Sequence, residues 1–232
     1  MAARRGFTWM LAVIGLQVMW ASMACGDQVN PSGRAGASTG RFAAWQAIIA
    51  SSRARPDLQR ASVINRFFNQ FRSVPDSELW GMVDYWATPG ELLTAGAGDC
   101  EDFALAKYLS LIGTGVAANR LWLVYTRALR PDGRRIEPHM VLVFRASDGR
   151  YWVLDNLRAD VVPLAQRRDL SVSKALNGSG VWHLTKTEAP VRVAGREALP
   201  PQALRVLAAD DPGTALARAD GTSTTEDRSA RR

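Results

Sequence analysis

The sequence predicts an α+β fold in which N-terminal helices and a central helix pack on an antiparallel sheet. Apolar residues recur at helical spacing over residues 42–71, which predicts the N-terminal helices. Residues 100–112 are apolar on nearly all sides, as expected of a helix buried in the centre of a domain. Short segments rich in Val, Leu and aromatic residues follow, separated by turn residues, and these predict the strands.

The first part of the domain is expected to form two amphipathic helices and then a short one. Thr88, Pro89 and Glu91 have the spacing of a capping box with proline in the first helical position, so the short helix is expected to begin there. The two amphipathic helices lie on either side of Pro56, and we interpret their aromatic side chains as core residues. Their apolar positions are Phe42, Trp45, Ile48 and Ile49, then Leu58, Ala61, Ile64, Phe67, Phe68 and Phe71.

The predicted strands follow the central helix. Turn residues at 131–133 and 147–149, each ending in Asp-Gly, are expected to separate the first three of them. The predicted strands are residues 121–127, 139–145, 151–155 and 181–186.

The composition excludes several classes of protein. The chain has 232 residues, 47% of them hydrophobic and 22% charged, which is enough for one domain with a real core. The net charge is +7, but the arginines are scattered without a dense block, so no nucleic-acid partner is indicated. With two cysteines and two histidines, a disulfide framework and a thiolate-rich zinc site are excluded.

The first residues are typical of an export signal. Two arginines precede an almost wholly apolar run at residues 7–20, and small residues follow it. We expect a signal peptide over residues 1–26, since the run is shorter than the roughly 20 apolar residues of a membrane-spanning helix. Lipidation of Cys25 is the alternative reading of this segment.

Two further segments differ in composition from the domain between them. Pro, Gly and Ser are frequent in residues 27–40, which are expected to be a flexible leader. Residues 208–232 have no apolar periodicity and are expected to be a disordered tail. The domain is therefore expected to span residues 41–207.

Cys100 is the candidate nucleophile. It follows Gly98-Asp99 at the start of the predicted central helix, where unpaired backbone amides and the helix dipole favour a thiolate. The alternative is an inert buried thiol. The position at a helix start after a glycine-rich loop favours the nucleophile.

A cysteine nucleophile needs a base, and the base needs a group that orients it. His139 opens one predicted strand and Asp155 ends the next, so a hairpin centred on Ser147 would set them opposite each other. A tighter two-residue turn would place Arg158 opposite His139 instead. The spacing permits the pair without requiring it. His183 is the competing base, but no acid follows it closely.

The acids beside Cys100 allow two interpretations. Asp99 and Asp102 have helix-start spacing, and acids in a first turn suit the helix dipole. Together with Glu101, however, they oppose ionisation of the thiol, and a bound divalent cation would relieve that conflict. Calcium fits because the available ligands are hard carboxylate oxygens, although three acids are fewer than the six to eight oxygens it takes.

The backbone amide of Cys100 is the expected oxyanion donor, because it lies at a helix start. The indole N–H of Trp86 is a candidate for the second donor. The alternative for Trp86 is a place in the core.

Four blocks of the sequence resemble the bacterial transglutaminase-like cysteine proteinases of the LapG type. The resemblance implies a papain-like or transglutaminase-like core over roughly residues 42–184, in which Cys100 faces His139 and Asp155. It also implies that Asp99, Glu101 and Asp102 bind calcium needed for activity. The four blocks are residues 84–89, 97–104 with 107–108, 139–142, and 153–156.

The resemblance implies a biological role as well. Enzymes of this type are periplasmic and cleave a large surface adhesin near its N-terminus, which releases the adhesin and disperses biofilm. An inner-membrane receptor that senses cyclic diguanylate holds them inactive. Two alternatives remain open from the sequence: a transglutaminase-type acyl transferase with the same residues, and a non-catalytic calcium-dependent binding module on the same fold.

Overall fold

The computed structural model describes residues 31–129 and 133–207. In these residues the helices are α1 (Pro31–Ser52), α2 (Asp57–Phe68), α3 (Asp76–Leu79), α4 (Pro89–Ala95), α5 (Cys100–Gly113) and α6 (Pro201–Leu207). The strands are β1 (Arg72–Ser73), β2 (Ala97–Gly98), β3 (Leu121–Leu129), β4 (Ile136–Arg145), β5 (Tyr151–Leu154), β6 (Val162–Pro163), β7 (Leu170–Asn177), β8 (Gly180–His183) and β9 (Val191–Ala194).

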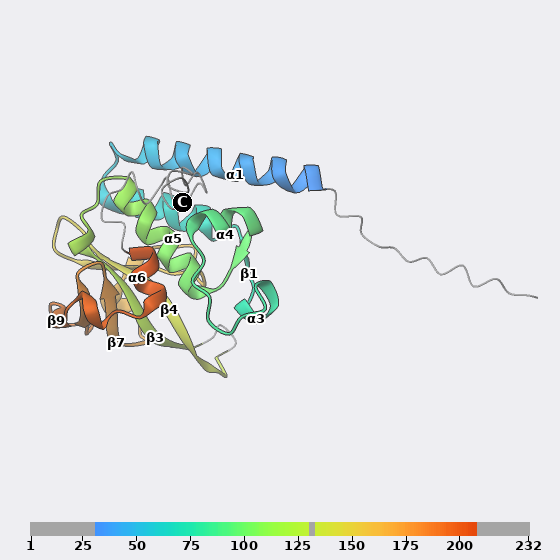
Figure 1. Ribbon diagram of the computed structural model, residues 1–232. Coiled ribbons are helices and arrows are strands. Elements are labelled where there is room, and N and C mark those ends of the chain that lie inside the picture. The colour runs from blue at the N-terminus through green and yellow to red at the C-terminus, as the bar shows by residue number, and fades with distance from the viewer. Residues whose placement is uncertain (1–30, 130–132, 208–232) are drawn as a thin grey trace, which may run out of the picture.

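The described residues form one seven-stranded sheet, in the order β6-β5-β4-β3-β7-β8-β9, and a separate pair of short strands. Every neighbouring pair in the large sheet is antiparallel, whereas β1 and β2 are parallel. Helix α5 packs against β3 and β4, and α1, α2 and α4 pack around α5 (Figure 1). The predicted α+β fold with a central helix on an antiparallel sheet is confirmed.

Helix α1 begins earlier than the sequence predicted. It starts at Pro31, so residues 31–40 of the expected flexible leader are helical, and these first turns extend beyond the other helices (Figure 1). Proline suits a first turn because its missing N–H has no helical partner there. Arg41 fastens the following part of α1 to α4 by donating from Nε to Leu93 O at 2.6 Å. The predicted signal peptide, residues 1–26, and the predicted tail, residues 208–232, lie outside the described residues.

The capping box predicted for the short helix α4 is present. Thr88 Oγ1 accepts the N–H of Glu91 at 3.2 Å, and Glu91 Oε2 accepts the N–H of Thr88 at 2.7 Å. Gly96 then ends the helix with φ +66°, a left-handed conformation that glycine adopts without a steric penalty. These two ends fix α4 directly before the segment that carries Cys100.

The first three predicted strands are observed as β3, β4 and β5, with shifted ends. The fourth, predicted at residues 181–186, is β8 and ends at His183. Strands β6, β7 and β9 were not predicted from the sequence. In β7 the register with β3 shifts beside Ser173, and this bulge interrupts the alternation that identifies a strand. Strands β6 and β9 are too short to show a periodic pattern.

The sheet separates two apolar cores. On β4, Met140, Leu142 and Phe144 join the larger core, which also contains the buried side of the helices. Val141 and Val143 point to the opposite face and join a smaller cluster. Helix α5 is buried from Asp102 to Gly113, as its all-round apolar sequence predicts. The nucleophile candidate is therefore carried by the most buried helix of the domain.

Leu105→Ala should lower the free energy of unfolding by about 2–5 kcal/mol, because truncation leaves a cavity where this leucine of α5 is 0% exposed. Urea unfolding followed by tryptophan fluorescence measures the loss. Leu129→Ala is the matched control, since Leu129 is 40% exposed and its truncation should change stability by less than about 0.5 kcal/mol. Equal losses in the two variants would contradict the central position of α5.

Candidate active site

A glycine-containing bend places Cys100 at the first residue of α5. At Gly98 a Cβ atom would lie 2.8 Å from Asp102 Oδ2, so this close approach requires glycine. Asp102 Oδ2 accepts the N–H of Asp99 at 3.2 Å, and its Oδ1 accepts the N–H of Ala87 at 2.7 Å. Asp102 therefore has the helix-start role expected of it, and it also ties the helix to the preceding segment.

The surroundings of Cys100 hold its thiol in the protonated form. The Sγ donates to Glu101 Oε2 at 3.0 Å and accepts a hydrogen bond from the backbone N–H of Met140. Burial, followed by the charges of Glu101 and Asp99, raises the pKa of Cys100 far above its usual range. These effects outweigh the helix N-terminus, which by itself favours a thiolate.

His139 forms a buried pair with Asp155. The imidazole lies on β4 and is 6% exposed. Its Nε2 is 2.9 Å from Asp155 Oδ1, which is hydrogen-bond distance. This is the orienting contact that a general base requires from a third group.

In the hairpin that carries this pair, His139 and Asp155 do not lie directly opposite each other, as a hairpin centred on Ser147 would place them. Leu142 pairs with Leu154, a shift of two positions, and Asp155 lies just beyond the end of β5. The loop between the two strands is longer than a two-residue turn, and it contains Gly149 at φ +83°. Because side chains alternate with a period of two, a shift of two positions keeps the side chains of His139 and Asp155 on the same face of the sheet.

Both carboxylate oxygens of Asp155 have partners. Oδ1 also accepts the N–H of Leu157 at 2.9 Å, and Oδ2 accepts a hydrogen bond from Arg167 Nη2 at 2.7 Å. Burial opposes ionisation, but His139, Leu157 and Arg167 together bring the pKa of Asp155 well below its usual range. Sequence reasoning missed Arg167, which lies in a segment without a motif that distinguishes it from the other arginines.

The thiol contacts β4 at the residue next to His139. Met140, whose N–H donates to Cys100 Sγ, directly follows the histidine in the strand. Since Asp155 occupies Nε2, Nδ1 is the imidazole nitrogen that can receive the thiol proton. The structure thus brings Cys100 beside the strand that carries His139, and His139 into contact with Asp155.

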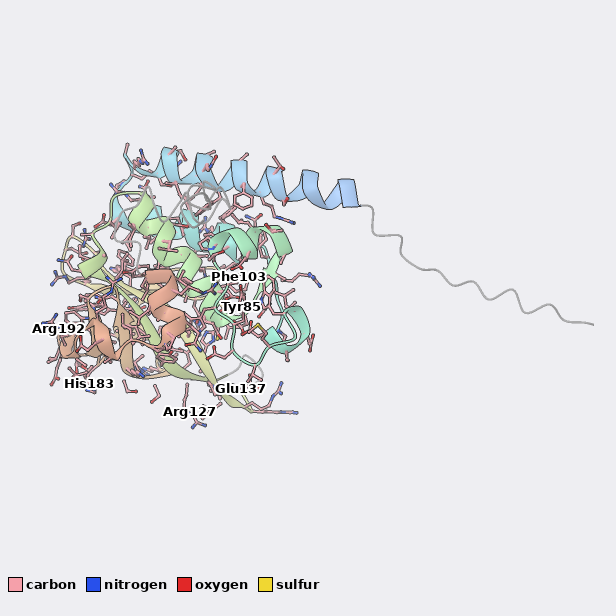
Figure 2. All side chains as sticks on the ribbon, in the orientation of Figure 1. Tyr85, Phe103, Arg127, Glu137, His183 and Arg192 are labelled. Atoms are coloured by element: carbon pink, nitrogen blue, oxygen red, sulfur yellow. The ribbon has the colours of Figure 1, made fainter. Side chains whose placement is uncertain are left out.

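His183, the competing base, lies elsewhere. It is exposed at the end of β8, and β7 and β3 separate that strand from β4. Figure 2 shows His183 near Arg192 at the margin of the molecule, away from Tyr85 and Phe103. With strands spaced about 4.8 Å apart, three intervals exclude a hydrogen bond to Cys100.

Trp86 occupies the core and does not have a free indole N–H. It is 2% exposed, and its Nε1 donates to Asp84 Oδ1 at 3.1 Å. Of the two interpretations of Trp86, the structure favours the core residue over the oxyanion donor. The expected first donor, the Cys100 N–H, lies at the start of α5.

The acids near Cys100 form a larger cluster than the sequence predicted. Oxygens of Asp76, Asp99 and Asp102 lie within 4.8 Å of one another, as do those of Asp76, Asp84 and Glu101. Sequence reasoning missed Asp76 and Asp84. Asp84 begins the first block of the family resemblance, which was the available signal, whereas Asp76 joins the cluster only through the fold.

Burial and mutual repulsion raise the pKa values of Asp76, Asp99 and Asp102. The pKa of Asp99 rises to about 9, through burial and the charge of Glu101. That of Asp102 rises to about 7, because burial outweighs its two backbone hydrogen bonds. Burial likewise raises the pKa of Asp76. The cluster is therefore a set of carboxylates that lack countercharge.

The donor set of this cluster fits a hard divalent cation. Its five side chains offer carboxylate oxygens, the ligands that calcium prefers. Within the described residues, Asp76 Oδ1 and Asp99 Oδ1 are buried and have no hydrogen-bond partner. Buried polar atoms normally have a partner, so these two oxygens indicate a missing positive ligand.

A helix-borne thiol beside a buried His–Asp pair, on an antiparallel sheet, defines the class of the protein as a cysteine proteinase. Residues 45–183 match the family described as bacterial transglutaminase-like cysteine proteinase, BTLCP. This match spans more than half of the chain, and the chain belongs to that family.

Solved structures of LapG from Legionella pneumophila are similar to this chain. The calcium-bound form has 32% sequence identity and a TM-score of 0.59, and the match covers 71% of this chain and 86% of that one. A second LapG structure has 33% identity, a TM-score of 0.55 and coverages of 63% and 79%. The EGTA-treated form has 31% identity, a TM-score of 0.56 and coverages of 67% and 82%. A search of curated protein sequences finds no match.

The stability of the domain in EDTA should fall as the pH rises from about 5 to about 7. The folded pKa values of Asp102, about 7, and Asp99, about 9, exceed the unfolded value near 4. The folded state therefore binds more protons than the unfolded state in this window, so the free energy of unfolding falls as the pH rises. Lys107, whose pKa burial lowers to about 7, acts in the opposite direction only above that pH.

Urea unfolding at about pH 5 and about pH 7 should show a free energy of unfolding that is lower at the higher pH by more than about 1 kcal/mol. Asp102→Asn should reduce the slope with pH, whereas Asp148→Asn, at a surface acid, should leave it unchanged. A free energy of unfolding that is constant or rises over this pH range would contradict the conclusion that the carboxylates of the cluster lack countercharge.

Proposed function

We propose that this protein is a calcium-dependent cysteine endopeptidase of the periplasm that cleaves a large surface adhesin near its N-terminus and so promotes biofilm dispersal. The observation that carries the proposal is the buried pair of His139 and Asp155 beside the helix start of Cys100, in a member of a cysteine proteinase family.

In the proposed mechanism, His139 Nδ1 accepts the proton of Cys100 Sγ, and the thiolate attacks the peptide carbonyl carbon. The N–H of Cys100 at the start of α5 stabilises the oxyanion. His139 then donates its proton to the leaving amine, which leaves a thioester on Cys100. Water attacks the thioester while His139 accepts its proton. The bond between the acyl carbon and Sγ then breaks, the acid product departs, and His139 returns the proton to Cys100 Sγ. Asp155 keeps the imidazole oriented throughout.

The acid cluster supports the proposed calcium dependence. Asp76, Asp84, Asp99, Glu101 and Asp102 would hold the ion through their carboxylate oxygens. A bound Ca²⁺ supplies positive charge that lowers the pKa of a nearby thiol. Glu101 is the link between the two functions, because its Oε2 now accepts the thiol hydrogen bond. The similarity to calcium-bound and EGTA-treated LapG structures agrees with this proposal.

The proposed location is the periplasm. It rests on the export signal expected at residues 1–26, which lies outside the described residues, and on the family resemblance. In the part of the chain that the structure describes, no helix is sufficiently long and apolar to cross a membrane.

The proposed partners rest on the family resemblance. They are the surface adhesin as substrate and an inner-membrane receptor for cyclic diguanylate as inhibitor. We include no nucleic-acid partner, because the arginines form no dense block in the sequence.

Cys100→Ala should reduce cleavage of a candidate adhesin by at least about 1,000-fold, because the nucleophile is lost. The purified protein is incubated with calcium and the adhesin's N-terminal region, and the fragments are followed by gel electrophoresis and mass spectrometry. His183→Ala, at an exposed residue away from Cys100, is the control and should retain activity.

Circular dichroism should show that Cys100→Ala is folded. Cleavage that persists in this folded variant would reject Cys100 as the nucleophile. A labelled primary amine in the same reaction distinguishes the alternative: its incorporation in place of hydrolysis would identify an acyl transferase. Binding of the adhesin without cleavage by the wild-type chain would identify a binding module.

Asp76→Asn and Asp84→Asn should each weaken calcium binding by roughly tenfold or more, because each removes a charged oxygen ligand. Isothermal titration calorimetry on metal-stripped protein measures the affinity. Asp148→Asn, an exposed acid on the loop before β5, is the control and should bind calcium normally. Wild-type calcium affinity in both variants would show that Asp76 and Asp84 are not calcium ligands.

A further inference from the structure

Arg167 is one of the most deeply buried charged side chains of the described residues. It follows the short helix η2 (Leu164–Gln166), and its side chain is 2% exposed. Nη2 lies 2.7 Å from Asp155 Oδ2, whose own side chain is 0% exposed. On its other side, Nε donates to Asp169 Oδ1 at 2.9 Å and Nη2 to Asp169 Oδ2 at 2.8 Å. The guanidinium therefore joins two carboxylates.

The rest of the chain holds Arg167 in place. Asp169 engages two of its nitrogens, a bidentate geometry that fixes the plane of a guanidinium. Lys186 Nζ donates to the backbone oxygen of Arg167 at 2.7 Å. The position of Nη2 opposite Asp155 is thus set by contacts that do not involve Asp155 itself.

We infer that Arg167 is a positioning residue of the reactive centre: it holds Asp155 Oδ2 so that Oδ1 stays directed at His139, which keeps the imidazole proton on Nε2 and leaves Nδ1 able to accept the thiol proton. The inference rests on the proposed role of His139 as the base, and it adds a residue that acts through Asp155 and touches no substrate.

The physical reason is the burial of Asp155. A carboxylate without countercharge in this environment would take up a proton, and the resulting carboxylic acid could donate to Nε2. The imidazole would then carry its own proton on Nδ1, where it could not accept one from Cys100. An ionised Asp155 can only accept, so it selects the Nε2–H tautomer.

The other charged and polar groups around Asp155 do not replace Arg167. Lys107 of α5 hydrogen-bonds to Asn69 Oδ1 at 2.7 Å, and Asn69 Nδ2 donates to the backbone oxygen of Asp155 at 2.9 Å. Asn69 therefore holds the main chain of Asp155, and Lys107, whose hydrogen bond goes to Asn69, interacts with Asp155 electrostatically. Burial lowers the pKa of Lys107 to about 7, whereas an arginine stays charged. Arg158 contacts Asp169 at 3.8 Å, on the far side of Arg167.

Nitrogen NMR of the isotope-labelled protein tests this inference, because the two tautomers of a neutral imidazole have distinct nitrogen shifts. The chain has two histidines, and exposed His183 serves as the internal reference. Spectra are recorded at about pH 8, where an unperturbed imidazole is neutral. The readout requires no turnover, so a failure of the proposed proteolysis and a failure of this inference are distinguishable.

The wild-type protein should show His139 with more than about 90% Nε2–H, and the neutral variants Arg167→Met and Arg167→Gln should fall below about 50%, as expected when the orienting carboxylate is lost. Arg167→Lys, which keeps the charge, should restore the Nε2–H tautomer. Asp155→Asn supplies the reference for the Nδ1–H tautomer, and Arg168→Met, at the exposed neighbouring arginine, should match the wild type.

Three results would overturn the inference. The first is a folded neutral variant that keeps the wild-type tautomer, which would make Arg167 a structural residue only. The second is a wild-type His139 with its proton on Nδ1, and this measurement tests the inference even where a neutral variant does not fold. The third is loss of the Nε2–H tautomer in Arg168→Met as well, since the effect would then not be specific to Arg167.

Discussion

The crowding of buried carboxylates around one thiol is the constraint on which the rest of this site depends. Asp102 has a structural role, because it caps the start of α5 and binds the main chain of the preceding segment. Asp76 likewise accepts the N–H of Tyr85 at 2.5 Å. These two acids lie in one cluster with Asp99 and Glu101, whose charges oppose ionisation of Cys100. A cation at the cluster would reconcile these two demands, which gives the proposed calcium dependence a structural cause.

The two halves of the reactive centre differ in charge balance. On the histidine side, Arg167 lies between Asp155 and Asp169, so these three buried or partly buried charges have opposite partners. On the cysteine side, carboxylates face one another, and the pKa values of Asp99 and Asp102 are raised. The proposed base is therefore oriented by its neighbours, whereas the proposed nucleophile lies beside uncompensated negative charge.

Segments far apart in the chain meet around the acid cluster. Helix α6, near the end of the domain, places Arg205 5.1 Å above the ring of Tyr85, and its Nη2 donates to the backbone oxygen of Trp86. Gln202 reaches Asp84 Oδ2 at 3.4 Å. The loop that carries Asp84 is thus held by the last helix of the described residues, and the geometry of the cluster depends on the whole domain.

Local chemistry was sufficient to predict the helix start of Cys100 and the central position of α5, because both depend on residues adjacent in the chain. It permitted the pair of His139 and Asp155 without deciding it, since the register depends on how a loop closes. Asp76 and Arg167 could not be identified from the sequence at all. An acid or an arginine in an irregular segment acquires its role only from what packs beside it, and contacts between distant segments are decided by the tertiary structure.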